Sequence, residues 1–120
     1  MAVGLDVTHQ APVTSDVWSL ILDADSPPAQ IIQALYRSRV ENPESGQSYI
    51  HDAMAVAAAL DPDLISWEPH SIAMQMDDIH RGESRIVHGG SVQVAKDVDA
   101  LTFMSRFYER LGISSSLDAT

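Results

Sequence analysis

Residues that could do chemistry gather at one point of the sequence, where His51 and Asp52 stand directly before eight uninterrupted apolar residues, Ala53 to Leu60. A histidine side chain gains or loses its proton near neutral pH, so His51 could act as an acid or a base. The unpaired N–H groups and the dipole at a helix start favour a carboxylate such as Asp52. The alternative stays open that Asp52 only caps a helix and that His51 is a boundary residue without a function.

The run from Ala53 to Leu60 predicts the helix that positions this pair. Its residues are mostly strong helix formers and are apolar on every face, which is typical of a helix buried on all sides. Asp61 precedes Pro62, and because a residue before proline is displaced from the α region, the helix is expected to end near Leu60. The run is too short to cross a membrane. The N-terminal end of this helix is then the end that carries the chemistry.

A polar loop, Glu44 to Ser48, leads into Tyr49 and the helix start. Loops beside a functional helix end often close over a substrate, and Tyr49 could belong to such a lid. An equally good interpretation is a solvated connection with Tyr49 packed on the core.

Local patterns predict the remaining elements. Val3, Leu5 and Val7 alternate with polar or small residues, which predicts an opening strand. Ser26 followed by Pro27 is a typical helix start, and the Gly89-Gly90 pair is typical of a two-residue hairpin turn. The expected order is a strand over Val3–Thr8, a helix capped by Thr14 or Ser15, a helix from Pro27 to before Pro43, the central helix, a half-buried strand over Ser71–Asp77, a hairpin turning at Gly89-Gly90, and a closing helix from Asp99 to Gly112.

Two phrases resemble the inosine-uridine preferring nucleoside hydrolase family. The first is Val3 to Gln10, reading VGLDVTHQ, and the second is His51 to Ala57, reading HDAMAVA. Arg81-Gly82 and the stretch Val92 to Asp99 followed by a helix are similar to the family's last segment. The resemblance covers nearly the whole chain and corresponds to the C-terminal portion of a family member only.

This resemblance implies an α/β fold. Residues 1–120 would form a single partial domain, the C-terminal portion of a nucleoside hydrolase-like fold. It would comprise the opening strand, several helices, a terminal antiparallel hairpin and a closing helix, with residues 113–120 as a frayed tail.

The resemblance also implies hydrolysis of the N-glycosidic bond of purine or pyrimidine ribonucleosides, a reaction of nucleoside catabolism. His51 corresponds to the histidine that protonates the leaving base, and Asp52 to a calcium ligand that also touches the ribose. His51, Asp52 and Tyr49 would contact the substrate. Calcium takes about six to eight oxygen ligands, of which Asp52 can supply two at most. The family's aspartate-rich loop has no counterpart here, so the site is incomplete and the isolated chain is expected to be inactive.

An incomplete site leaves the role of the chain open. It could bind a nucleoside if the site is completed, and the expected partners are a complementary N-terminal chain or, by self-association, a further copy of the chain. The alternative is a noncatalytic acidic interaction module, or a degenerate remnant, that self-associates or completes another chain.

Composition narrows the possible partners. With 17 acidic and 7 basic residues the net charge is −10, which disfavours nucleic acid and anionic membranes and suits hard cations such as calcium. There is no cysteine, which excludes disulfides and thiol chemistry and fits a reducing cytoplasm. The first residues lack the pattern of a signal peptide, so the expected location is cytoplasmic.

Other catalytic motifs are absent from the sequence. It contains no glycine-rich phosphate loop, no Gly-x-Ser-x-Gly elbow and no His-Glu-x-x-His zinc helix. His70, His80 and His88 lack a recurrent ligand spacing. Asp77 and Asp78 are adjacent, and because neighbouring side chains on a strand point to opposite faces, they are expected to be solvated rather than to share a cation.

Overall fold

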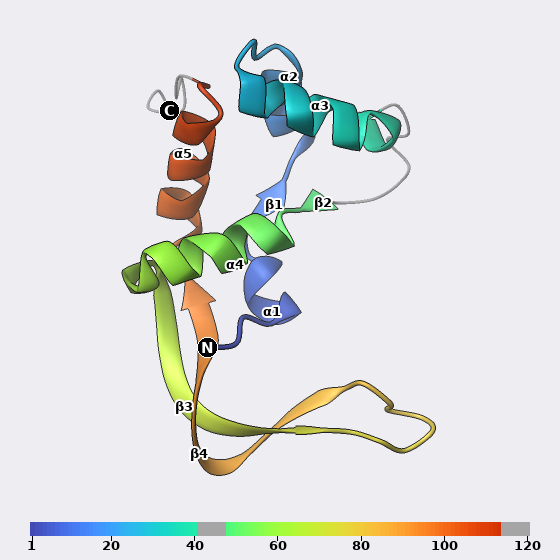
Figure 1. The fold of residues 1–120 in the computed structure, drawn as a ribbon, viewed down its shortest axis with the longest axis vertical. Helices are drawn as coiled ribbons and strands as arrows, with labels where there is room; N and C mark the ends of the chain where they lie inside the picture. Colours follow the sequence, from blue (N-terminus) through green and yellow to red (C-terminus); the bar gives the residue numbers. More distant parts are fainter. Residues whose placement is uncertain (41–47, 114–120) are drawn as a thin grey trace.

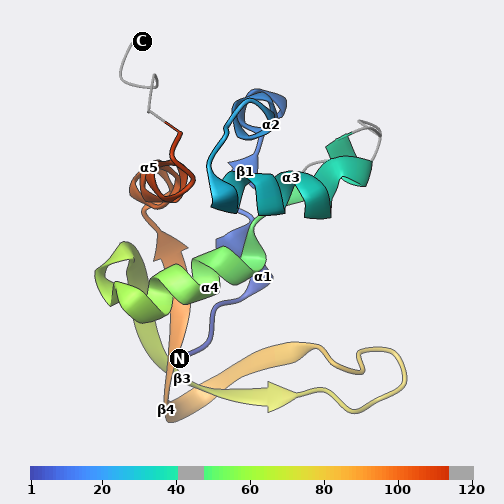
Figure 2. The same ribbon diagram turned by 45° about the horizontal axis from the view of Figure 1, so that its top comes forward.

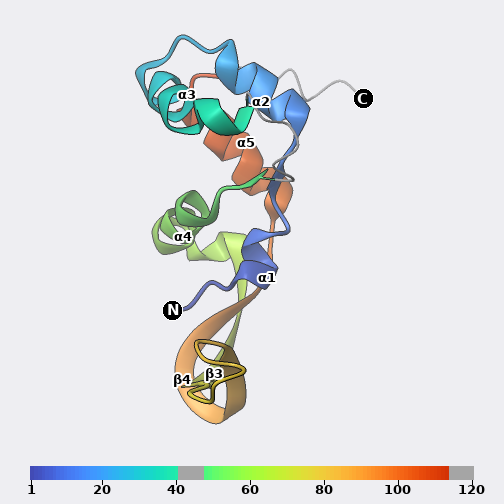
Figure 3. The ribbon, with the colours of Figure 1, turned by 90° about the vertical axis from the view of Figure 1, so that its right-hand side faces the viewer.

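The computed structural model describes residues 1–40 and 48–113, which form a group of helices at one end and a long β-hairpin at the other (Figures 1 and 3). The mixed α/β class, the antiparallel hairpin and the closing helix expected from the sequence are confirmed. The elements are α1 (Leu5–Thr8), β1 (Pro12–Val13), α2 (Ser15–Leu22), α3 (Pro27–Val40), β2 (Ser48–Tyr49), α4 (His51–Leu60), the 3₁₀ turn η2 (Pro62–Leu64), β3 (Ile65–Met74), β4 (Ser84–Val98) and α5 (Ala100–Arg110).

The opening strand predicted over Val3–Thr8 is wrong. This segment forms the single helical turn α1, in which the Thr8 N–H donates to the Gly4 carbonyl at 3.1 Å. Only Ala2 makes a strand-type contact, a parallel bridge to Val94. An alternating pattern this short fits a helical turn as well as a strand. The turn is favoured because it directs Val7 and Thr8 into the interior.

The two helices predicted before the loop are confirmed. In α2, Val17 and Ile21 face the interior. The Ser26 hydroxyl accepts the Ala29 N–H at 3.2 Å, so Ser26 caps α3 as its sequence position predicts. The Gln33 side chain donates to the Ile21 carbonyl at 2.7 Å and ties α3 to the end of α2. Of the predicted polar loop, Glu44–Gln47 lies outside the described residues.

Helix α4 ends at Leu60 as predicted and begins at His51, two residues before the run Ala53–Leu60 that predicted it, but the prediction that it is buried on all sides is wrong. Met54 and Ala58 are buried, whereas Val56 is 57% and Leu60 is 82% exposed. Met54 packs into a hydrophobic cluster with Val7 of α1. The remaining buried members are Ala11, Ala58, Leu64, Ile65, Ala95 and Phe103. The elements among residues 1–40 and 48–113 therefore cover one face of α4 and leave an apolar face open.

The hairpin formed by β3 and β4 does not turn at Gly89-Gly90. The turn lies between Met74 and Ser84, and the two glycines lie inside β4. His70 pairs with Val92 and Ser71 with Val87, so residues 88–91 of β4 form a bulge opposite one step of β3. Gly90 has φ +113°, and a Cβ there would lie 2.0 Å from the Ser71 Oγ. Glycine is needed for this close approach, and the hairpin bends along its length (Figure 1).

Helix α5 contributes side chains to two hydrophobic clusters of the helical part. Its Phe103 belongs to the cluster that contains Met54, while Tyr108 and Leu111 pack with Ile21 of α2 in a second cluster. Figure 2 shows α5 beside α2. Ile113, predicted as the start of a frayed tail, is instead buried, and residues 114–120 lie outside the described part. No helix within the described ranges is long and apolar enough to span a membrane.

Candidate functional site

The candidate site forms where two distant segments of the chain run side by side. Strands β1 and β2 pair antiparallel, with Pro12 opposite Tyr49 and Val13 opposite Ser48. The turn α1 lies just before β1 and helix α4 begins just after β2. This short pairing therefore brings the end of α1 against the start of α4.

A hydrogen bond joins these two segments. The Thr8 Oγ1 lies 2.7 Å from the His51 Nδ1. Thr8 is buried and His51 is half-buried, so the contact is partly shielded from water. The same hydroxyl donates to the Leu5 carbonyl within α1 at 3.3 Å.

Three aromatic rings lie together at this point. His9 stacks on Tyr49 with ring centroids 4.2 Å apart and an interplanar angle of 23°. The His51 ring lies 5.5 Å from His9 and 5.8 Å from Tyr49. Tyr49 and His51, both predicted as site residues, are therefore neighbours. Together the rings form a surface on which a planar ligand could stack.

Asp52 lies on a different face of α4 from His51. Consecutive residues of a helix do not share a face. The Asp52 side chain is exposed and lines a mostly apolar cavity of about 180 Å³ that also borders Tyr49, Trp18 and Phe107. The alternative that Asp52 caps the helix is not supported, because Ile50 occupies the N-cap position and no side chain caps it.

The described residues do not by themselves fit a calcium ion. Among them, no group of three or more histidine, cysteine or acidic side chains is placed to hold a metal. Asp52 could offer two oxygens, well short of the roughly six to eight that calcium takes. The further oxygens would have to come from other residues or from another chain.

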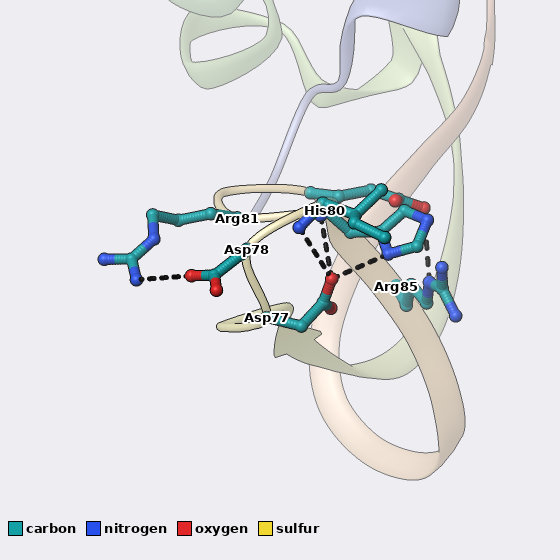
Figure 4. A network of polar contacts seen from close by, with 7 residues as sticks. Asp77, Asp78, His80, Arg81 and Arg85 are labelled. Atoms are coloured by element: carbon teal, nitrogen blue, oxygen red, sulfur yellow. Dashed lines mark hydrogen bonds and ion pairs between the residues drawn. The ribbon is translucent and has the colours of Figure 1, made fainter.

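The side chains of Asp77 and Asp78, at the hairpin tip, interact with residues of the turn itself. Asp77 accepts hydrogen bonds on Oδ1 from the His80 backbone N–H and from the His80 ring, both at 2.9 Å (Figure 4). The backbone N–H of His80 is the main cause of the lowered pKa of Asp77, and the His80 ring adds to it. Asp78 instead pairs with Arg81 at 3.6 Å. The two carboxylates point apart, as predicted.

A second, mostly apolar hollow is lined by neither His51 nor Asp52. It holds about 450 Å³ between the open face of α4 and helix α5, where Val56, Leu60 and Phe107 line it. Arg106 at its edge forms an ion pair with Asp61. Among the described lining residues the one carboxylate, Asp61, is engaged by Arg106, so the hollow suits a packing partner better than a reaction.

Sequence reasoning missed Thr8 and His9. Both belong to the phrase VGLDVTHQ that supported the resemblance, yet no role was assigned to them. The available signal was their position as adjacent polar residues at the end of that phrase. Their neighbours Tyr49 and His51, which follow 40 to 43 residues later, could be found only from the fold.

Comparison with known proteins assigns most of the chain to one family. A family model described as inosine-uridine preferring nucleoside hydrolase matches residues 1–105. No curated protein sequence matches the chain.

Solved structures agree with that family. A plant nucleoside hydrolase, PpNRh1, has a TM-score of 0.75 and 25% identity over 90% of this chain and 39% of its own. A purine-preferring ribonucleoside hydrolase from Gardnerella vaginalis has a TM-score of 0.69 and 25% identity over 91% of this chain and 38% of its own. An inosine-guanosine nucleoside hydrolase, at 18% identity, shares the fold with a TM-score of 0.73 over 92% of this chain and 38% of its own. The chain thus spans 38–39% of the length of these three structures.

Proposed function

Because the chain belongs to the inosine-uridine preferring nucleoside hydrolase family, we propose that it supplies the leaving-group side of a ribonucleoside N-glycosidase. The observation that supports this best is the position of His51 beside the stacked rings of His9 and Tyr49. A planar nucleobase that packs on these rings would place its nitrogens near an imidazole.

In the proposed reaction His51 is the general acid. The N-glycosidic bond breaks, its electron pair stays on the base nitrogen, and that nitrogen takes a proton from His51. Water adds to the sugar carbon and its released proton restores the histidine, so that ribose and free base are the products. General-acid assistance of this kind contributes about 10²–10⁴ in rate.

The chain alone is expected to be inactive, because the described residues form no calcium site and the family resemblance implies one. Completion of the site by a complementary N-terminal polypeptide is part of the proposal. The chain spans 38–39% of the solved hydrolases, which leaves room for such a part. The cytoplasmic location expected from the sequence stays a prediction.

Ribose release from inosine and uridine tests this function. The chain is assayed alone and after replacing the corresponding segment of the Gardnerella vaginalis hydrolase, to which it is 25% identical. The chain alone should release no ribose, whereas the chimaera should be active. In the chimaera, His51→Ala should lower kcat by about 10²–10⁴. His88→Ala, which removes an exposed histidine of β4, is the matched control and should have no effect. An active chimaera that tolerates His51→Ala would contradict the role of His51.

A second candidate function is a noncatalytic interaction module. The open apolar face of α4, with Val56 57% and Leu60 82% exposed, favours it. In this case the chain self-associates or docks on another chain through the hollow between α4 and α5. Sedimentation velocity should show association that Val56→Asp abolishes. Ala59→Asp adds the same charge to an exposed part of α4 outside the hollow and should leave the association intact.

A further inference from the structure

Thr8 makes two contacts through one hydroxyl group, and a hydroxyl has a single proton to donate. Its Oγ1 lies 3.3 Å from the Leu5 carbonyl oxygen and 2.7 Å from the His51 Nδ1. A carbonyl oxygen can only accept, so the contact with Leu5 requires the hydroxyl proton. Both contacts can be hydrogen bonds at the same time only if the Thr8 oxygen accepts from His51, which requires a proton on Nδ1.

We infer that Thr8 is a positioning residue that holds His51 as the Nδ1–H tautomer and leaves Nε2 as the atom that exchanges a proton with a ligand. This inference rests on the proposed function for its catalytic meaning only. The geometry that supports it stands without that function.

The surroundings of Thr8 hold its hydroxyl in place. The backbone N–H of Thr8 donates to the Gly4 carbonyl at 3.1 Å, and the preceding residue, Val7, is fully buried. Threonine in a helical turn directs its hydroxyl to a carbonyl three or four residues earlier, as Thr8 does to Leu5. Because Thr8 is only 4% exposed, water does not readily replace either contact.

This tautomer suits the acid step. In the charged imidazole both nitrogens carry protons, and Thr8 accepts from Nδ1 while Nε2 faces the reaction. When Nε2 gives its proton to the leaving base, the ring becomes neutral and keeps its proton on Nδ1. Thr8 holds the same bond before and after the transfer, so the ring need not turn. The commoner tautomer of histidine in water carries the proton on Nε2 instead and would have to rearrange.

The tautomer can be measured in the isolated chain by nitrogen-15 NMR. Long-range proton–nitrogen spectra are recorded at a pH where the imidazole is neutral, and the His51 signals are identified by their loss in His51→Gln. The wild-type ring should show a protonated Nδ1 and an unprotonated Nε2. In Thr8→Val, which keeps the shape of the side chain without its oxygen, the signals should shift toward the Nε2–H form. Thr8→Ser, which keeps the oxygen, should restore the wild-type pattern.

Two results would overturn the inference. A wild-type His51 in the Nε2–H form would mean that Thr8 donates to the ring, and it would settle the matter even if Thr8→Val failed to fold. A Thr8→Val spectrum identical to the wild-type spectrum, from a folded chain, would show that other groups select the tautomer.

The same variants separate this inference from the proposed function. In an active chimaera, Thr8→Val should lower kcat roughly tenfold or more with little change in KM, since hydrogen bonds to charged groups are worth about that factor. Thr8→Ser should recover most of the loss. If the chimaera releases no ribose at all, the proposed function fails while the NMR result on Thr8 keeps its meaning.

Discussion

One carboxylate, Asp99, fixes the start of α5. Its Oδ1 accepts the Thr102 backbone N–H at 3.0 Å, and its Oδ2 accepts the Thr102 hydroxyl at 2.7 Å. The hydrogen bond from the Thr102 backbone is the main cause of the lowered pKa of Asp99. Because α5 contributes side chains to both hydrophobic clusters, its first turn matters to the whole helical part.

Replacing Asp99 by Ala should therefore lower the thermal midpoint by a few degrees, since a lost N-cap exposes unpaired N–H groups. Glu109→Ala, at the opposite end of the same helix, should be neutral or slightly stabilising because a negative charge there opposes the helix dipole. Thermal unfolding by circular dichroism compares the two variants. An equal fall of the thermal midpoint in both variants would show that the Asp99 cap does not contribute to stability.

The pH dependence of the Asp99 effect has a defined sign. The folded pKa lies below the ordinary carboxyl value, so the stabilisation is fully present above that ordinary value. It is lost as the pH falls through the lowered pKa. The difference in thermal midpoint between the wild type and Asp99→Ala should therefore shrink in acid.

Local residue patterns predicted the caps of α3 and α5 and the position of His51 and Asp52 at the start of a helix, but not a side-chain cap on α2, which Thr14 does not provide, nor the contact between Thr8 and His51. Ser26 and Asp99 cap helices as their positions predict, because capping involves residues only three apart. The contact of Thr8 with His51 depends on the pairing of β1 with β2. These strands have two residues each, which is too short for any periodic pattern.

At the scale of elements, the bulge in β4 shows that a glycine can be required by a contact with a residue far away in the sequence, here Ser71 of β3. Gly89 and Gly90 both have positive φ, at +79° and +113°. Only at Gly90 would a Cβ collide with the other strand, where it would also lie 2.6 Å from the Ser71 backbone nitrogen. The Gly-Gly dipeptide favours a tight turn, but here it permits close contact between β4 and β3. The local sequence alone could not distinguish a turn from a bulge.

Gly90→Ala should open the hairpin locally. Amide hydrogen exchange in the strand pairs beside the bulge, Ser71 with Val87 and His70 with Val92, measures this opening. Gly89→Ala is the matched control, because it adds the same methyl group in open space. A positive φ costs about 1–2 kcal/mol in either variant, so Gly89→Ala should speed exchange roughly tenfold and Gly90→Ala considerably more. Equal effects would show that the contact with Ser71 is unimportant.

Because only one face of α4 is buried, substitutions at Met54 and at Val56 should differ strongly in their effect on the free energy of unfolding. Met54 is 1% exposed within the cluster that contains Phe103, so Met54→Ala should lower the free energy of unfolding by about 2–5 kcal/mol. Val56→Ala, on the open face, should change it by less than about 0.5 kcal/mol. Urea unfolding measures both. A large loss in Val56→Ala would mean that something covers this face in solution.

The sequence could not show this one-sidedness. Apolar side chains such as alanine, valine and leucine occupy every face of α4, so the sequence pattern does not indicate which face is buried. In this chain the described neighbours cover one face only. The apolar residues of the other face have no function in the fold of residues 1–40 and 48–113.

At the scale of the whole molecule, the projecting hairpin makes the structure more extended than a compact domain with the same number of residues. The radius of gyration is 16.7 Å, against about 14 Å for a typical compact domain of this length. The outer half of the hairpin, residues 72–86, contributes no member to either hydrophobic cluster. Apolar side chains such as Met76 and Ile79 are exposed along it.

Replacing residues 72–86 by a short turn should leave the thermal midpoint within a few degrees of the wild type, because both clusters stay intact. Small-angle X-ray scattering should report a smaller radius of gyration. Loss of cooperative unfolding in the shortened chain would show that the outer hairpin stabilises the helices.

The bridge between Ala2 and β4 has a consequence for the order of folding. The Ala2 N–H donates to the Gln93 carbonyl and the Ala95 N–H donates to the Ala2 carbonyl, both at 2.8 Å. During synthesis from the amino end, the first residues cannot make these bonds until residue 95 has emerged. Pairing of β3 with β4 joins residues much closer in the chain and loses less entropy on closing its loop. We therefore expect the hairpin to form before the Ala2 bridge, which can close only once β4 has been synthesised.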